Sequence, residues 1–153
     1  MKRHILITGA TGTIGKRLIS VLQMSGHSIS ILSRKPRTIK NVKVYVWNVN
    51  KQQIDLNCLS GTDTIIHLAG ENIAEKKWTK ERKQQIIESR TLSTRLLYRA
   101  ITETNAAVKT FISASAVGFY GNRGDEILTE ESGSGSGFMA TCCKLWEDAV
   151  DEG

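Results

Sequence analysis

The sequence has few cysteines and no long apolar run. Its three cysteines, two of them adjacent at Cys142 and Cys143, form neither a disulfide framework nor a spaced metal site, so we expect reduced thiols and no bound metal. No window holds the ~18 consecutive apolar residues of a membrane span. The N-terminus also lacks the charged region, apolar stretch and cleavage site of a secretory signal. We therefore expect a cytoplasmic protein with no membrane partner.

Aromatic residues make up only 6% of the chain, whereas the formal net charge is +6. A basic chain can bind nucleic acid, so the placement of the basic residues matters more than their total. They form two groups, one of Arg34, Lys35, Arg37 and Lys40 and one of Lys76, Lys77, Lys80, Arg82 and Lys83. No series of aromatic side chains alternates with either group, and no zinc-finger or helix-turn-helix spacing occurs. We expect no nucleic-acid partner and interpret the second group as a solvated face.

The most informative segment is the start of the chain, where an apolar run at residues 4–7 leads directly into Thr8-Gly9-Ala10-Thr11-Gly12-Thr13-Ile14-Gly15. A strand, a glycine-spaced turn and a helix in this order can hold a nucleotide pyrophosphate at the helix N-terminus. Gly9 would permit the tight turn, Gly12 would let the phosphates approach the backbone, and Gly15 would let the helix pack on the strand. The residues assigned to this dinucleotide site are Thr8, Gly9, Gly12, Thr13, Ile14 and Gly15. A glycine-rich turn that binds nothing is the alternative.

Strand and helix patterns alternate along the rest of the chain. After the first strand, we predict further strands at 29–32, 42–47, 64–70 and 108–113, and an irregular crossover at 51–60. Helices are predicted after the glycine turn, from Thr79 to about Glu103, and from Phe138 onward. The chain has 153 residues, 40% of them apolar, which suits one domain with a core. The fold class is therefore α/β, a Rossmann-type doubly wound parallel sheet.

The predicted sheet has five strands, whereas a complete dinucleotide-binding sheet has six. We interpret residues 1–153 as an NAD(P)-binding domain that is truncated before its last strands and before a substrate-binding region. An uncovered edge on the fifth strand favours pairing with another chain, so a homodimer through that edge is a further hypothesis.

Several separated motifs resemble the extended short-chain dehydrogenases/reductases, the class of the nucleotide-sugar epimerases and dehydratases. They are Thr8 to Gly15, His67-Leu68-Ala69-Gly70, Ser113-Ala114-Ser115-Ala116 and Phe119-Tyr120-Gly121. Residues 68–74, Trp78, residues 88–90 and Trp146-Glu147 resemble more narrowly a poorly characterised branch labelled epimerase-family or cell-division-inhibitor-like. The resemblance implies a nicotinamide cofactor, with Leu68, Ala69 and Gly70 among its contacts, and a chain that continues into a smaller substrate-binding region.

The residue after the second strand distinguishes the two nicotinamide cofactors, because a carboxylate there binds the ribose 2′-OH and an arginine pairs with a 2′-phosphate. This strand ends at Ser33-Arg34, and no carboxylate follows until Asp55. Since a guanidinium holds phosphate through parallel charge-assisted hydrogen bonds, we predict NADP rather than NAD. The resemblance places Asn48 near the adenine, although an ordinary turn asparagine is an equal alternative.

Catalysis is less well specified. Reductases of this class use a serine, a tyrosine and a lysine four residues after the tyrosine, which lowers the tyrosine pKa from about 10. Ser115 matches the serine, but Met139 and Cys143 occupy the positions of the tyrosine and lysine. Tyr120 is the nearest phenol, and packing on the sheet end is its alternative role. We interpret His67 as a strand-end residue lining the cofactor cleft rather than as a base.

Two functions remain open at this point. The first is an NADP-binding oxidoreductase or epimerase-like protein that moves hydride to or from a carbonyl or carbinol carbon of a small molecule. The second is an inactive module that binds or senses NADP(H). The missing tyrosine and lysine favour the second, whereas the ordered motifs favour the first.

Overall fold

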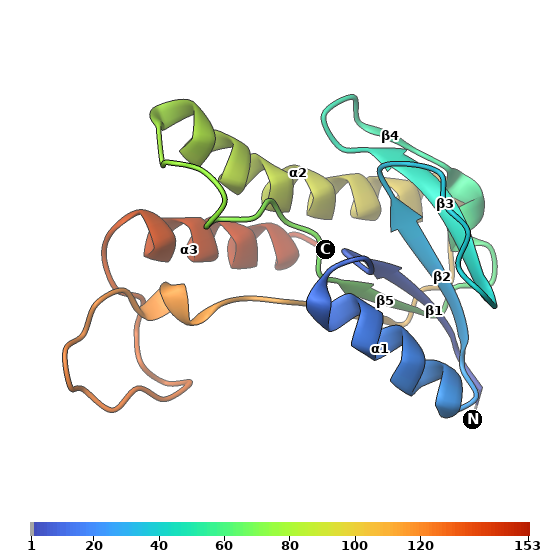
Figure 1. Ribbon diagram of the computed structural model, residues 1–153, viewed down its shortest axis with the longest axis horizontal. Helices are drawn as coiled ribbons and strands as arrows, with labels where there is room; N and C mark the ends of the chain where they lie inside the picture. The colour runs from blue at the N-terminus through green and yellow to red at the C-terminus, as the bar shows by residue number, and fades with distance from the viewer. Residues whose placement is uncertain (1) are drawn as a thin grey trace.

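The computed structural model describes residues 2–153 as a six-stranded sheet with three α-helices (Figure 1). The strands are β1 (His4–Thr8), β2 (Ser28–Ser33), β3 (Val42–Asn48), β4 (Gln53–Ile54), β5 (Thr64–His67) and β6 (Thr110–Ser113). The helices are α1 (Thr13–Met24), α2 (Lys80–Thr104) and α3 (Phe138–Val150), and two short 3₁₀ helices span Leu56–Leu59 and Val117–Tyr120. The predicted α/β class is confirmed.

The strand order is β4-β3-β2-β1-β5-β6, and every pairing is parallel except that of β3 with β4. The chain runs outward from β1 through β2 to β3, then returns to place β5 on the other side of β1. This reversal creates a topological switch point between β1 and β5, the place where open α/β sheets bind ligands. The order of the five parallel strands is that of a Rossmann sheet.

The predicted count of five strands was wrong, because the segment interpreted as a crossover at 51–60 contains β4. This strand has only two residues and pairs antiparallel with the end of β3, Ile54 opposite Trp47 and Gln53 opposite Asn48. A two-residue strand has no measurable alternation, so hydrophobic periodicity could not reveal it.

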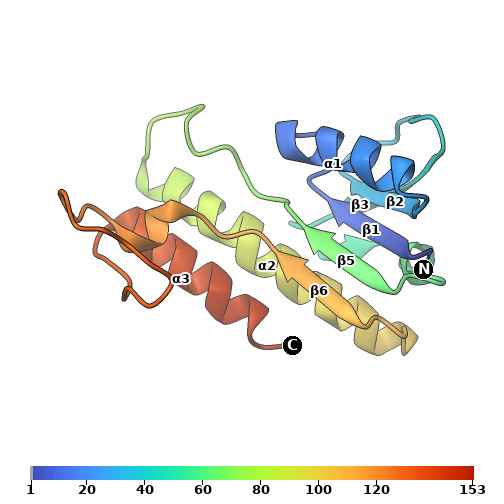
Figure 2. The same ribbon diagram turned by 90° about the horizontal axis from the view of Figure 1, so that it is seen from below.

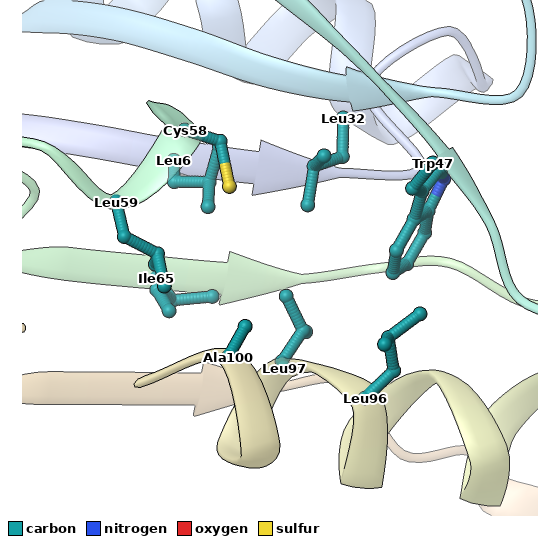
Figure 3. Close-up of a cluster of buried hydrophobic side chains, with 9 residues drawn as sticks. All are labelled: Leu6, Leu32, Trp47, Cys58, Leu59, Ile65, Leu96, Leu97 and Ala100. Atoms are coloured by element: carbon teal, nitrogen blue, oxygen red, sulfur yellow. The ribbon is translucent and has the colours of Figure 1, made fainter. Parts of the chain in front are cut away.

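Helix α1 covers one face of the sheet, and α2 covers the other. Along β1, Ile5 and Ile7 face the side where Ile19 of α1 packs, whereas Leu6 faces α2, as the two-residue period of a strand requires. On the α2 side, Leu96, Leu97 and Ala100 meet Leu6, Leu32 and Ile65 in the cluster drawn in Figure 3. Helix α3 lies beside α2, as Figure 2 shows. The core is therefore two apolar layers separated by a sheet that is buried on both faces near its centre.

The basic group at 76–83 is not uniformly a solvated face, and this interpretation needs one correction. Arg82 is 7% exposed, because its guanidinium turns inward from the first turn of α2 toward the loop that follows β5. Lys76, Lys77 and Lys80 are exposed. Lys83 is half-buried, with its ammonium 5.3 Å from the centre of the Phe138 ring. Arg82 and Lys83 thus have structural contacts that the charge pattern did not indicate.

Three further findings concern the described residues 2–153. No helix there is long and apolar enough to cross a membrane. No group of three or more histidine, cysteine or acidic side chains in that range is arranged to hold a metal ion. Cys58, Cys142 and Cys143 are buried free thiols.

Candidate functional site

Two glycines of the opening motif are required by close backbone contacts. Gly9 has a φ of +65°, and a Cβ there would lie 2.5 Å from the carbonyl oxygen of Leu68. A Cβ at Gly15 would lie 2.5 Å from the Cα of Ala10. The first contact joins the glycine turn to the loop after β5, and the second holds α1 against the end of β1. The positive φ of Gly9 fits the tight turn predicted there, and the contact at Gly15 fits the predicted packing of the helix, whereas the contact of Gly9 with Leu68 was not predicted.

Gly12 has a different environment. It is the N-cap of α1 with ordinary extended backbone, and a Cβ there would meet only the Gly9 carbonyl oxygen, at 3.3 Å. No side chain among residues 2–153 caps this helix end, and its first turn has no acidic residue. The N–H groups of Thr13, Ile14 and Gly15 therefore have no intrahelical partner. An uncapped helix end beside an open glycine surface fits an anionic phosphate, so the residues present suit the pyrophosphate of a dinucleotide.

Ile14 lies at this helix end with 71% of its surface exposed, and Thr13 is also exposed. Both residues, which the sequence assigned to the site, thus face outward at the mouth of the glycine turn.

Thr8 and His67 form a buried hydrogen-bonded chain beneath the site. The Thr8 hydroxyl oxygen accepts from the backbone N–H groups of Leu68 and Ala69, each at 3.2 Å, and lies 2.7 Å from His67 Nδ1. His67 Nε2 lies 3.0 Å from the Ser93 hydroxyl, which donates to the Ser89 carbonyl. With the Thr8 oxygen accepting twice, its proton points to Nδ1, so the ring carries its own proton on Nε2. Thr8 therefore shapes the loop from within the protein.

The interpretation of His67 as a residue lining the cofactor cleft was wrong. Its side chain is fully buried between β5 and α2, against Trp47 and Phe111. Burial lowers the pKa of His67 to about 4, which keeps the ring neutral at physiological pH. It is a core residue that ties the strand to the helix, and it cannot reach a ligand.

Ser33 is the last residue of β2 and Arg34 follows it directly, and Arg34 has a partner that the sequence did not reveal. Its guanidinium is 79% exposed and donates to Glu71 Oε1 at 2.9 Å. Glu71 Oε2 accepts from the buried Arg82 at 3.1 Å. Burial acts to raise the pKa of Glu71, but the Arg82 hydrogen bond and the Arg34 charge outweigh it and hold that pKa below its ordinary value. Ser33 is nearly buried, and its hydroxyl lies 3.4 Å from the Lys35 N–H.

The loop that carries Leu68, Ala69 and Gly70 is fastened to α2. Ser89 Oγ accepts from the Glu71 N–H at 3.0 Å, and the Arg90 guanidinium donates to the Glu71 carbonyl. A Cβ at Gly70 would lie 2.9 Å from the Arg90 guanidinium carbon, so the loop and this arginine are in close contact. These contacts fix the loop after β5 to the side of α2.

Asn48 has a structural contact of its own. Its side-chain oxygen accepts from the Lys51 N–H at 3.0 Å, which closes the turn between β3 and β4. This contact matches the turn-asparagine alternative, and it leaves the side-chain NH₂ group available to a base.

The carboxyl end of β6 holds the candidate catalytic residues. Ser115 is exposed there, and its hydroxyl donates to Glu147 of α3. Tyr120 lies in the 3₁₀ turn after Ser115, half-buried and packed edge-to-face on Phe119. Cys143 is buried, and burial raises the pKa of its thiol. Glu147 is therefore the ionisable side chain of α3 that touches Ser115.

Two carboxylates, Glu71 and Glu147, were missed as site residues. Both stood in the motifs of the narrower resemblance, but their partners come from distant elements. Glu71 contacts residues 37 and 11 positions away in the chain, and Glu147 contacts one 32 positions away. Sequence spacing carries no signal for such contacts.

Together, the topological switch point between β1 and β5, the uncapped helix after a glycine turn and the arginine at the end of β2 define a Rossmann-type dinucleotide-binding protein. The NAD dependent epimerase/dehydratase family matches residues 5–141, and the chain belongs to that family. This confirms the family resemblance read from the motifs.

Relatives and solved structures agree with this assignment. An epimerase family protein of Mycobacterium leprae is 36% identical over 149 residues, which are 97% of this chain and 47% of that protein. A nucleoside-diphosphate sugar epimerase from Corynebacterium glutamicum is 39% identical with a TM-score of 0.81, covering 99% of this chain and 31% of that one. The human epimerase family protein SDR39U1, solved with NADPH, is 26% identical with a TM-score of 0.77 over 96% of this chain and 48% of its own. The chain spans about half the length of the curated relatives it matches.

Proposed function

We propose that this chain is the cofactor-binding part of an NADP-dependent oxidoreductase or epimerase of the extended short-chain type. The observation that carries the proposal is the open start of α1, where no side chain among residues 2–153 caps the helix and its first N–H groups lack intrahelical partners. Family membership adds to this support. The substrate-binding region belongs, in this proposal, to sequence that follows the family's cofactor domain.

The preference for NADP rests on Arg34. The guanidinium is exposed at the end of β2, where a 2′-phosphate would lie, and no carboxylate stands on that strand end. The NADPH in the human relative's structure supports this choice. Glu71 is the one acidic group that contacts Arg34 among residues 2–153, and it reaches Arg34 from the opposite side of β1.

A bound nicotinamide supplies a carbon that accepts or donates hydride. In the proposal, Ser115 donates its hydroxyl proton to Glu147, which holds the hydroxyl in place, and the Ser115 oxygen accepts a hydrogen bond from the substrate hydroxyl. The carboxylate is also the group nearest Ser115 that can accept a proton. This arrangement differs from the tyrosine and lysine of ordinary reductases, whose helical positions hold Met139 and the buried Cys143.

The second candidate is a protein that binds NADP(H) without turning it over. The buried, non-ionised Cys143 favours it, because a thiol with a raised pKa cannot replace the lysine ammonium. Turnover over a panel of carbonyl compounds and nucleotide sugars would remove this candidate.

Calorimetric titration with NADP and NAD tests the proposal. We expect binding of both, tighter for NADP, and loss of the NADP preference in Arg34→Ala. Absence of heat with either dinucleotide would overturn the assignment of the helix end as a pyrophosphate site.

A further inference from the structure

The ion pair between Arg34 and Glu71 is not explained by dinucleotide binding alone. Arg34 follows β2 and Glu71 follows β5, and these strands flank β1 on opposite sides. In the register of the sheet, Thr8 at the end of β1 stands beside Leu32 of β2 and His67 of β5. The ion pair therefore crosses over the carboxyl end of β1, above the point where the glycine turn leaves the sheet.

The two arginines that share Glu71 are not equivalent. Arg82 is 8% exposed at its side chain and also donates to the Asn72 carbonyl at 2.7 Å, so its place is fixed by several contacts. Arg34 is 79% exposed, and Glu71 is its only hydrogen-bond partner among residues 2–153. An exposed ion pair contributes little to stability, whereas a pair that holds a buried arginine is costly to break. Arg34 is thus the exchangeable partner and Arg82 the permanent one.

We propose that Arg34 and Glu71 form a clasp over the carboxyl end of β1, which opens when Arg34 exchanges the Glu71 carboxylate for the 2′-phosphate of a dinucleotide. This inference rests on the proposed function and assigns Glu71 a role in cofactor selection. A 2′-phosphate offers Arg34 a dianionic acceptor for two hydrogen bonds, and a ribose 2′-OH does not. Glu71 keeps Arg82 after the exchange, so no buried charge is left unpaired.

The clasp has a consequence for affinity. Because Glu71 competes with the phosphate for Arg34, its negative charge weakens NADP binding and leaves NAD binding nearly unchanged. Glu71→Gln keeps an oxygen acceptor for Arg82 and removes the charge. We expect this variant to bind NADP about two- to fivefold more tightly, because the competing interaction that it removes is one exposed ion pair, which is weak.

The test is a double-mutant cycle by calorimetry on the wild type, Arg34→Gln, Glu71→Gln and the double variant, each titrated with NADP and with NAD. Arg34→Gln changes an exposed side chain, so its fold is expected to be intact, and thermal unfolding checks all four proteins. The clasp requires that Glu71→Gln tighten NADP binding in the wild-type background and have no effect when Arg34 is absent. An unchanged or weaker NADP affinity in Glu71→Gln, or a gain that persists without Arg34, would overturn it.

A measurement on the wild type avoids any effect of substitution on folding. The ¹³C signal of the Glu71 carboxyl can be titrated with pH in the free protein and with saturating NADP or NAD. Arg34 and Arg82 are the charged groups that face this carboxyl. We expect its pKa to rise with NADP and to stay unchanged with NAD, and equal behaviour with both would contradict the exchange. Failure of the wild type to bind either dinucleotide is a separate result, which refutes the proposed function itself.

Discussion

At the scale of single residues, the glycines of the opening motif separate into structural and binding roles. Gly9 and Gly15 have backbone atoms 2.5 Å from where a Cβ would stand, whereas Gly12 has open space on one side. Substitution by alanine should therefore lower stability at Gly9 and Gly15, and should weaken dinucleotide binding at Gly12.

For Gly12→Ala we expect a loss of dinucleotide affinity of about tenfold or more, because the methyl group keeps phosphate from the N–H groups and one charge-assisted hydrogen bond is worth ~1.5–3 kcal/mol. Its free energy of unfolding should change by less than ~1 kcal/mol, as for an ordinary N-cap change. Gly15→Ala is the matched control, with ~1–3 kcal/mol of destabilisation from overpacking against Ala10. Calorimetry and urea unfolding measure both, and an unchanged affinity in Gly12→Ala would contradict the site.

A single residue, His67, also makes the free energy of unfolding depend on pH. Its pKa is about 4 in the folded protein and 6.5 for an unperturbed histidine, so only the unfolded chain takes up a proton between these pH values. The neutral ring's contribution is complete above pH 6.5 and falls as the pH drops toward 4. Between pH 7.5 and pH 5 the loss is about 2 kcal/mol of unfolding free energy. Urea unfolding at several pH values should show this slope in the wild type and a shallower one in His67→Gln, and equal slopes would refute the role of this histidine.

At the scale of elements, the sequence was sufficient to predict a strand or a helix where hydrophobic periodicity or a capping residue was present. The buried run in β5 and the alternation in β3 predicted those strands, and Thr79 was identified correctly as the start of α2, where its hydroxyl accepts from the Arg82 N–H at 3.2 Å. The two-residue β4 exists only because it pairs with the end of β3, a contact that no local pattern records.

In the candidate site, too, contacts between distant segments could not be predicted from local sequence patterns. Gly9 and Gly15 could be assigned from spacing because the positive φ of Gly9 and the contact of Gly15 with Ala10 are local to the turn. The role of Glu71 depends on β2 and α2 arriving beside the same loop, so only the assembled fold reveals it. His67 was misplaced for a related reason, since a strand-end position does not tell which face of the sheet a side chain takes when a helix covers that face.

The N-cap of α2 can be tested as an element. Thr79→Ala should lower the free energy of unfolding by about 1 kcal/mol, because the Arg82 N–H loses its acceptor. Thr102→Ala is the control, an exposed threonine inside the same helix, where alanine is neutral or stabilising by ~0.5 kcal/mol. Equal destabilisation by both substitutions in chemical denaturation would argue against the cap.

At the scale of the whole molecule, the sheet has two unequal edges. One ends in β4, a short antiparallel strand that offers little backbone for further pairing. The other ends in β6, four residues long, which pairs with β5 on one side and with no strand of residues 2–153 on the other. Ile112 of this strand is 49% exposed. An open parallel edge with an exposed β-branched side chain is the kind of surface that pairs with another chain.

We propose that chains of residues 1–153 associate through β6. Ile112→Lys places a charge on the edge, where lysine opposes strand pairing, and leaves the buried faces of the sheet unchanged. Sedimentation velocity over a concentration series should show a concentration-dependent dimer in the wild type and a monomer in Ile112→Lys. Val117→Lys is the control, because Val117 is 87% exposed but lies in the 3₁₀ turn outside the strand. A monomeric wild type, or equal dissociation by both variants, would contradict pairing through this edge, since only the first substitution puts a charge on the strand that a second copy would pair with.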